Sequence, residues 1–467
     1  MGEKRFSRRD FLKQAVIVGG AVAVAGCAPQ IIEKTVEVEK VVKETVEVEK
    51  SVEKTVKETV VVQAPGSEMI VLTAAHAWEA AFEAHQETFD NMFMEKNPNI
   101  FIKRINSGWS EHNQIVPTWA AANELPDIIY VHGSRAFPWN KEGIMISIDN
   151  YTAVDSAFDV LGVWPEALKL YQYKAKQYEI PYDHGPVILG YNKDLFDASS
   201  VDYPTEDWTW DDFLVAAKKL TIPGKQFGYS GYYGSPFGLG NEWGIALVGP
   251  WGGSVFADDE SKLMIDEEKA IAALKWHADL ISKEKVAPNP AESTAFPAGI
   301  WVAGSAAMFG LATWGVPQMH EFGAFNYDVA PWPKGPEGRK TGSFGSGYGI
   351  TKDSKNPDAA WKYMSGYLDT EGMTYMWAAS GRGSPARKSA YEAYLKAEIN
   401  PPNAKYFGDA LDTYAETGHP YHTAASGEVA DILGKYSGLV SAGEMTVEDC
   451  VKNIVAEANP KLAAAEH

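Results

Sequence analysis

Tryptophan and tyrosine, the aromatic residues that carry a polar group, are unusually frequent in this sequence. The chain has 467 residues, among them 15 tryptophans and 22 tyrosines. Each of these side chains joins an apolar ring to a hydrogen-bonding atom, so both types recur where a partly polar molecule must be held. Most of them are expected to pack in the core, which leaves several for a site. The aromatic content therefore predicts a binding site for a small, partly polar ligand.

Two candidates for such a site follow predicted strands. The apolar runs at 69–73, 99–105 and 126–131 predict strands that alternate with helices. This alternation is typical of an α/β fold with a parallel, covered sheet, in which ligands lie beyond the carboxyl ends of the strands. Trp78 and His132 stand at such positions. Trp78 could equally be a core residue.

Further aromatic candidates come from the second half of the chain. Trp314 lies in a Thr-Trp-Gly turn that directly follows a predicted strand at 306–310. Trp243 lies beside Glu242 in a stretch rich in glycine and aromatic residues, 228–256. We take these three side chains as candidate ligand contacts, although either tryptophan ring could instead pack in the core.

Polar candidates lie in two glycine-rich segments. Ser346 and Tyr348 alternate with glycines on a predicted strand, and glycine allows a close approach between backbone and ligand. Arg382, in the sequence Ser-Gly-Arg-Gly-Ser, offers donors for hydroxyl or carboxylate groups.

The common motifs of catalysis are missing. The ten histidines form no HExxH or HxH pair, the serine in the glycine-rich strand does not fit GxSxG, and no Walker lysine–serine pair is present. The Asp211–Asp212 pair follows Thr209 at a predicted helix start, where acidic residues complement the helix N-terminus. The two cysteines, Cys27 and Cys450, permit no cysteine metal cluster or disulfide framework, and we expect Cys450 to be a packed, inert thiol. We therefore expect neither enzymatic activity nor a cofactor or metal.

Charge and hydrophobic content narrow the class of protein. The chain has 62 acidic against 42 basic residues and a formal net charge of -20, so nucleic acid and anionic lipid surfaces are not expected as partners. A hydrophobic content of 45% is enough for a large core in two domains or lobes.

Residues 1–27 are predicted to be an export signal that ends in a lipid attachment site. Ser7–Lys13 is similar to the twin-arginine signature, and the apolar run at 15–25 is too short to span a membrane. The sequence Val-Ala-Gly-Cys that ends at Cys27 resembles the bacterial lipobox, in which the cysteine is acylated and becomes the new N-terminus. The alternative is an ordinary hydrophobic anchor that contains a cysteine.

Residues 28–66 are predicted to be a charged stalk. Valine alternates with Glu, Lys and Thr, and TVEVEK occurs at 35–40 and again at 45–50. The pattern fits neither a strand nor a helix cleanly, so we interpret it as a tether between membrane and folded part. A coiled coil that oligomerises the protein remains an alternative. The sequence Val-Gln-Ala-Pro-Gly-Ser at 62–67 marks the boundary of the folded part.

The folded part resembles a known family over nearly its whole length: the extracellular solute-binding proteins of ABC sugar importers, the group that includes maltose-binding protein. The segments that carry the resemblance are Glu124–Ile129, Ile180–Pro186, Tyr191–Phe196, Thr209–Phe213, Ala306–Phe309, Val329–Pro336, Gly345–Ile350 and Lys355–Trp361.

The resemblance implies the two-lobed α/β fold of type II periplasmic binding proteins, with a ligand groove between the lobes. It implies three crossings between the lobes, near 180–183, 330–333 and 384–390. The corresponding boundaries are 68–180 and 331–385 for the N-terminal lobe, and 181–330 and 386–467 for the C-terminal lobe.

The resemblance also implies a ligand and a partner. The ligand would be a mono- or oligosaccharide, and the partner would be the permease of an ABC importer. Aromatic rings stack on the C–H faces of a sugar, while carboxylates, amides and arginines bind its hydroxyl rim. Trp314 would stack on the sugar, and Tyr182 and Asp183, at the first crossing, would form the floor of the groove. Packing at the hinge is the alternative role for these last two residues.

Other ligand and protein classes stay open. A polyol or a glycerol phosphodiester is an alternative ligand, although the absence of a clear basic cluster favours neutral sugars. The twin-arginine signature keeps an exported redox enzyme as a rival, and a structural surface lipoprotein is another. Turnover of the ligand would identify the enzyme, and ligand-induced closure would separate a binding protein from a structural lipoprotein.

Lipidation can be tested with one substitution. We predict that Cys27→Ala abolishes incorporation of a labelled fatty acid, because the acylated thiol is lost. Cys450→Ala, which removes the other thiol, should be labelled like the wild type. Equal label in Cys27→Ala and the wild type, after membrane fractionation, would contradict the prediction.

Overall fold

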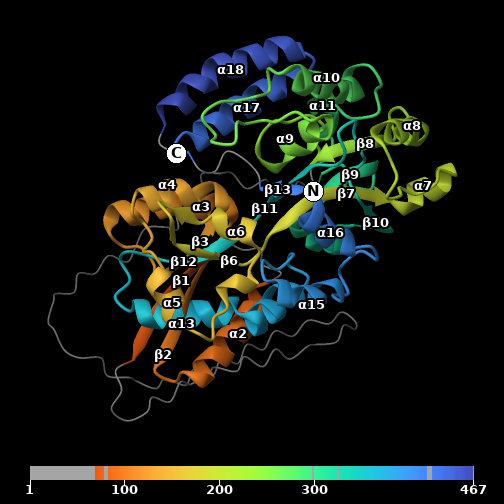
Figure 1. Ribbon diagram of the computed structural model, residues 1–467. Helices are drawn as coiled ribbons and strands as arrows, with labels where there is room; N and C mark the ends of the chain where they lie inside the picture. The colour runs from red at the N-terminus through yellow and green to blue at the C-terminus, as the bar shows by residue number, and fades with distance from the viewer. Residues whose placement is uncertain (1–68, 78–81, 297–298, 324, 418–422, 466–467) are drawn as a thin grey trace, which may run out of the picture. The chain divides into compact units, whose positions relative to one another are not determined.

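The structure is a computed structural model that describes residues 69–77, 82–296, 299–323, 325–417 and 423–465. The predicted signal peptide, Cys27 and the stalk therefore lie outside the described residues. Two β-sheets, each with its own helices, organise the described chain (Figure 1). We call the elements around the first sheet the first lobe and those around the second sheet the second lobe. Among the described residues, no helix is long and apolar enough to cross a membrane.

The first sheet confirms the predicted strands near the start of the folded part. The strand β1 is parallel to both of its neighbours, β2 and β3, as the alternation of strands and helices predicted. The strand β12 arrives from much later in the chain and pairs antiparallel with β3 and β6. In spatial order the strands are β2 (Ile100–Ser107), β1 (Ile70–Ala77), β3 (Ile128–His132), β12 (Ser346–Ile350) and β6 (Glu179–Pro181).

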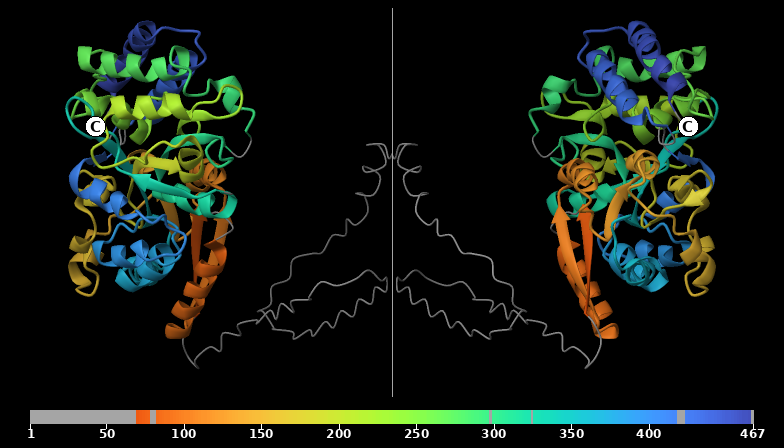
Figure 2. Two further views of the ribbon diagram at one scale, coloured as in Figure 1. Left: turned by 90° about the vertical axis from the view of Figure 1, so that its right-hand side faces the viewer. Right: turned by 90° about the vertical axis from the view of Figure 1, so that its left-hand side faces the viewer.

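Helices cover the first sheet, and most belong to its strand–helix–strand units. Figure 2 shows α2 beside the long strands β1 and β2, all in orange. The helices are α2 (Glu83–Lys96), α3 (Trp109–Ala122), α4 (Gly133–Lys141), α5 (Asp149–Val154), α6 (Pro165–Lys169), α13 (Pro357–Leu368) and α14 (Thr370–Met373), followed by the π-helix η5 (Thr374–Ala378).

The second sheet is built around the fully buried strand β7. β7 pairs antiparallel with β9, β10 and β11, while β8 is parallel to β9 and β13 is parallel to β11. In spatial order the strands are β13 (Ala415–Thr417), β11 (Thr341–Phe344), β7 (Gly185–Asn192), β9 (Ala306–Ala312) and β8 (Phe227–Tyr232), with β10 (Tyr327–Ala330) also on β7. A short two-stranded ladder, β4 (Gln172–Tyr173) and β5 (Lys176–Gln177), lies apart from both sheets.

The remaining helices belong mainly to the second lobe. Thr209 and Asp212 form a reciprocal capping box at the start of α8, so the acidic pair serves the helix N-terminus as predicted. The helices are α7 (Lys193–Ser199), α8 (Trp210–Leu220), α9 (Asn241–Val248), α10 (Glu268–Ser282), α11 (Pro290–Ser293), α12 (Val316–Phe322), α15 (Tyr391–Leu395), α16 (Lys405–Thr413), α17 (Ser426–Ser441) and α18 (Val447–Ala464). Cys450, in α18, is buried, and burial raises the pKa of its thiol to about 12.

The chain passes between the two sheets at positions that differ in part from those expected. It leaves β6 and enters β7 through 182–184, next to the expected first crossing. The second crossing lies at Gly345, between β11 and β12, and not near 330–333. The reason is that β10 and β11 both pair with β7, so the chain between them stays in the second lobe. The strand at 341–344, which the expected boundaries place in the N-terminal lobe, therefore belongs to the second sheet.

Hydrogen bonds join the crossing segments side by side. The Ser346 N–H donates to Oδ1 of Asp183 over 2.6 Å, and the Tyr182 N–H donates to the Ser346 carbonyl over 2.9 Å. On the other side, the Ala386 N–H donates to the Tyr182 carbonyl over 2.9 Å. The segment around Ala386 falls within the expected third crossing, 384–390. These bonds make one hinge out of three stretches that are distant in the sequence.

Gly345 should tolerate no side chain. An added Cβ would lie 2.1 Å from the Asp183 carbonyl oxygen, a backbone atom that the hinge holds in place. We predict that Gly345→Ala lowers the free energy of unfolding by about 1–3 kcal/mol or more, as overpacking does. Gly434→Ala, in α17, meets nothing within 4 Å and should raise it by about 0.5–1 kcal/mol. Urea unfolding measures the stability of both variants. Equal midpoints for Gly345→Ala and the wild type would contradict the predicted clash.

His277 predicts a pH-dependent stability. It lies among the rings of Trp210, Trp251 and Trp276, and burial lowers the pKa of its imidazole to about 3. The unfolded chain therefore binds a proton near pH 6.5 that the folded chain excludes, so His277 destabilises the protein as the pH falls. His277→Phe should gain up to about 3 kcal/mol relative to the wild type between pH 7 and pH 4. Denaturant titrations at a series of pH values measure this gain. A constant stability difference between His277→Phe and the wild type across that pH range would contradict the prediction.

Candidate functional site

A cavity of about 690 Å³ lies where the two lobes and the hinge meet. The residues that line it from the first lobe are Trp109, Tyr130, His132, Ser134, Arg135, Ser346 and Arg382. Those from the hinge are Tyr182, Asp183 and Gly345. Those from the second lobe are Tyr232, Tyr233, Trp314, Phe344, Ser426, Gly427, Ala430 and Asp431.

Aromatic rings line the cavity from both lobes. Trp109, at the start of α3, is 47% exposed, and its ring meets the His132 ring edge-on with centroids 5.3 Å apart. From the second lobe, the half-buried Trp314 donates its Nε1–H to the Tyr232 hydroxyl over 3.1 Å. The neighbouring Tyr233 is 49% exposed. Ring faces are thus available on opposite lobes of one cavity.

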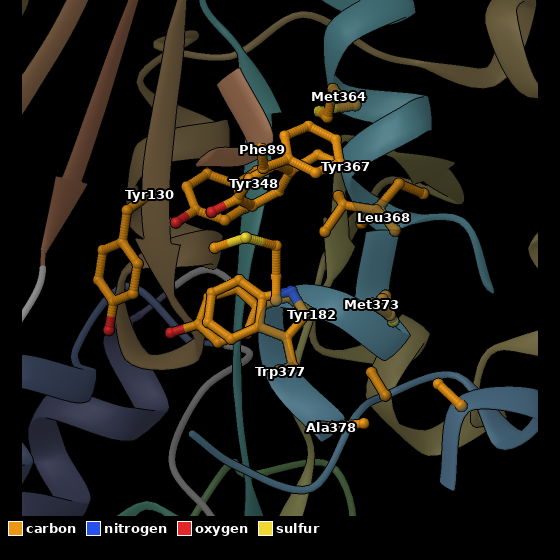
Figure 3. Packing of buried hydrophobic residues seen from close by; sticks show 14 of the residues in the cluster. Phe89, Tyr130, Tyr182, Tyr348, Met364, Tyr367, Leu368, Met373, Trp377 and Ala378 are labelled. Atoms are coloured by element: carbon orange, nitrogen blue, oxygen red, sulfur yellow. The ribbon is translucent and has the colours of Figure 1, made fainter. Parts of the chain in front are cut away.

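The hinge supplies a rigid, polar floor. Figure 3 shows the ring of Tyr182 stacked on that of Trp377 from the π-helix. The ring centroids are 3.8 Å apart and the planes are inclined by 12°. The Tyr130 hydroxyl lies 2.9 Å from the Ser346 hydroxyl, and the Ser346 N–H is bound by Asp183. Burial, and then the nearby Asp183 carboxylate, raises the pKa of Tyr182, so its hydroxyl stays neutral. The floor therefore offers hydroxyl donors and acceptors.

The charged groups of the cavity are few. Arg382 is only 6% exposed, and its guanidinium lies 5.4 Å from the centre of the Phe82 ring. Arg135, on α4, also belongs to the first lobe, whereas Asp431 stands on α17 of the second. Burial, and then the charge of Arg135, lowers the pKa of His132 to about 3, so its imidazole is neutral near neutral pH. The His132 Nδ1 lies 2.8 Å from the Ser134 hydroxyl.

Ring faces, hydroxyl groups and guanidinium groups line one cavity, and such groups can hold a ligand. Within the described parts of the chain, no cluster of three or more His, Cys, Asp or Glu residues could hold a metal ion. The arrangement can bind a ligand that presents both apolar faces and a polar rim.

Six of the residues predicted from the sequence lie together on the cavity wall. They come from both lobes and the hinge: Trp314, Tyr182, Asp183, Ser346, Arg382 and His132. Two others cannot be placed, since Trp78 and the side chain of Glu242 lie outside the described residues.

Trp243 and Tyr348 are corrections, because both are core residues outside the cavity lining. Trp243 is buried on α9 and stacks behind Tyr232, with centroids 5.6 Å apart. Tyr348 is on the same face of β12 as Ser346, but two residues further into the first lobe, where its hydroxyl lies 2.6 Å from Nδ1 of the buried His76. The glycines around Tyr348 serve close packing of the strands rather than access for a ligand.

Sequence reasoning missed several wall residues. Trp109 follows β2 and obeys the same strand-end rule that selected Trp78, so the signal for it was present. Tyr232 and Tyr233 lie in the aromatic stretch 228–256, where Trp243 was preferred to them. No signal pointed to Asp431, because α17 reaches the cavity only through tertiary packing.

Sequence comparison finds curated relatives of partial similarity, two of which are informative. An uncharacterized lipoprotein from Streptomyces antibioticus is 25% identical over 153 residues, 32% of this chain and 33% of the relative. An arabinooligosaccharide-binding protein from Halalkalibacterium halodurans is 25% identical over 177 residues, 38% of this chain and 37% of the relative. The chain thus matches only about a third of the length of each.

Solved structures match far more of the fold. An ABC substrate-binding protein from Listeria monocytogenes, in complex with cycloalternan, superposes with a TM-score of 0.76 at 25% identity, over 85% of this chain and 99% of that one. The GacH receptor of Streptomyces glaucescens superposes with a TM-score of 0.72 at 21% identity, over 85% and 98%. These likenesses confirm the expected two-lobed α/β fold.

The family described as bacterial extracellular solute-binding protein matches residues 72–374, which is well over half of the chain. This range contains nearly all of both sheets, apart from β13 and the first residues of β1, and most of the cavity wall. The chain belongs to the bacterial extracellular solute-binding protein family.

Proposed function

We propose that this protein captures a carbohydrate outside the membrane and delivers it to an ABC importer. One observation carries the proposal: ring faces from both lobes surround a cavity whose floor is made of hydroxyl groups. A sugar has the complementary surface, because its C–H faces suit aromatic rings and its hydroxyl rim suits polar side chains. The cavity volume of about 690 Å³ is within the range typical of small-molecule sites.

Two relatives support a carbohydrate as the ligand class. The Halalkalibacterium relative is named for binding arabinooligosaccharides, and the Listeria structure contains cycloalternan. Both are 25% identical to this chain, so they support the class of ligand and not its identity.

We further propose that Cys27 carries the lipid that holds the protein at the extracytoplasmic face of the membrane. The lipobox-like sequence and the lipoprotein relative from Streptomyces support this. Residues 28–66 would act as the tether, so that the two lobes can reach a permease while anchored. Firm anchoring needs more than one acyl chain, as in a fully processed lipoprotein.

A thermal-shift screen tests the proposed ligand class. The purified protein is heated with mono- and oligosaccharides, and with polyols and glycerol phosphodiesters as the rival classes. A ligand at a hundred times its Kd should stabilise the protein by about 2.7 kcal/mol. Stabilisation by a rival class alone would overturn the carbohydrate assignment.

The second test concerns Trp314. If its ring stacks on the ligand, Trp314→Ala removes a contact at the binding centre, which typically costs at least about 2 kcal/mol, or roughly thirtyfold in affinity. Trp314→Phe, which keeps a ring, should lose less. Titration calorimetry with the best ligand of the screen measures the affinity.

Trp276→Ala is the matched control. Trp276 is also half-buried in the second lobe, but it packs against Trp210 and lies outside the cavity lining. Its removal should lower the melting temperature and leave the affinity unchanged. If Trp314→Ala behaves in the same way, Trp314 is a packing residue and not a ligand contact.

A further inference from the structure

We propose that the carbohydrate bound in this cavity is acidic, and that Arg135 binds its carboxylate. The inference rests on the proposed function and makes it more specific, since it names a sugar with a uronate group as the ligand class. It departs from our expectation of a neutral sugar, which was based on the absence of a basic cluster in the sequence.

Arg135 is a cation of the cavity wall that has no carboxylate counter-ion among the described residues. Its Nε is buried and makes no hydrogen bond, and no ion pair links its guanidinium to a carboxylate of the described residues. Partial removal of a guanidinium from water is unfavourable unless hydrogen bonds and an opposite charge replace the water. Because Arg135 lines the cavity, a ligand can supply both.

The groups around Arg135 reinforce a positive potential. It is the third residue of α4, a helix of nine residues with no acidic residue in its first turn and no side-chain cap. The helix N-terminus therefore adds a partial positive charge to that of the guanidinium. The adjacent His132 is neutral, because burial and Arg135 itself lower its pKa to about 3. Among the described residues, no acidic side chain lines the cavity from the first lobe.

Two described acidic residues line the cavity, and neither forms an ion pair with Arg135. The Asp183 carboxylate is buried in the hinge, where Oδ1 accepts the Ser346 N–H over 2.6 Å. Asp431 is exposed on α17 of the second lobe. It is the competing counter-ion, because closure of the lobes could bring it to Arg135.

A carboxylate fits this site better than a hydroxyl or a phosphate group. The planar fork of Arg binds a carboxylate with two parallel hydrogen bonds, which are about twice as strong as neutral ones. A phosphate dianion would need more positive charge than the cavity offers, because its two guanidinium groups, Arg135 and Arg382, stand beside two aspartates. The chemistry therefore points to a monoanionic sugar acid.

The experiment compares matched pairs of neutral and acidic sugars on the full chain. The probes are oligogalacturonates, oligoglucuronates and alginate oligomers, each against its neutral counterpart: galacto-, gluco- and manno-oligosaccharides. We expect at least one acidic member to bind about tenfold or more tightly than its counterpart. Arg135→Gln should remove this preference, and raising the salt concentration should weaken it.

Lys141→Gln is the matched control, because Lys141 lies on the same helix, is exposed and carries the same charge. Its replacement should leave the preference intact. Asp431→Asn should leave acidic binding equal or stronger, since it removes a negative charge from the cavity. Weaker binding of neutral sugars by Asp431→Asn and by Arg135→Gln alike would instead identify an interlobe ion pair and overturn the proposal.

The remaining outcomes separate this inference from the proposed function. Neutral sugars that bind as tightly as their acidic counterparts, or an acidic preference that survives Arg135→Gln, would refute the role of Arg135 while leaving a carbohydrate-binding protein. Failure of every sugar of both series to bind would overturn the inference together with the proposed function.

Discussion

The hydrogen bond between the Asp183 carboxylate and the Ser346 N–H holds the two halves of the molecule in register. Asp183 lies on the passage from β6 to β7, and Ser346 is the first residue of β12. The bond therefore ties the first crossing to the second, and the Ala386–Tyr182 bond adds a third strand of chain. A buried carboxylate that accepts a backbone N–H is favourable only while this geometry persists, so the sheets and the cavity share one fixed floor.

The floor of the cavity also packs directly against the core of the first lobe. Tyr182 lines the cavity on one side and stacks on Trp377 on the other. Trp377 belongs to a π-helix, an irregular turn that is frequent at functional sites. A residue so held has little freedom to adjust to a ligand. The adaptable surfaces are the exposed rings of Trp109 and Tyr233, one on each lobe.

Much of the fold was predictable, because it depends on local pattern. The alternation of apolar runs and helices gave β1, β2 and β3 and their parallel pairing, and the family resemblance gave the two lobes. The predicted position of the second crossing was wrong because β10 and β11 both pair with β7. That pairing depends on tertiary structure and leaves no mark in the local sequence pattern. No feature of residues 330–333 distinguishes a hinge from a loop within one lobe.

The cavity wall was predictable where the end of a strand decided exposure, as for His132. It was not predictable where two similar side chains differ only in what packs over them. Trp314 and Trp243 both lie in glycine-rich surroundings, yet the first lines the cavity and the second backs Tyr232. The charge of the cavity was hidden for a similar reason, because Arg135 and Asp431 are some three hundred residues apart in a strongly acidic chain.

The burial of Cys450 makes the folded part convenient for spectroscopy. It is the only cysteine among the described residues, and a thiol with a pKa near 12 carries almost no thiolate at neutral pH, so it reacts slowly with labelling reagents. A protein shortened to the folded part would thus need no cysteine removed before a dye is attached. A pair of cysteines introduced on the exposed faces of α4 and α17 would report the distance between the lobes directly, with and without ligand.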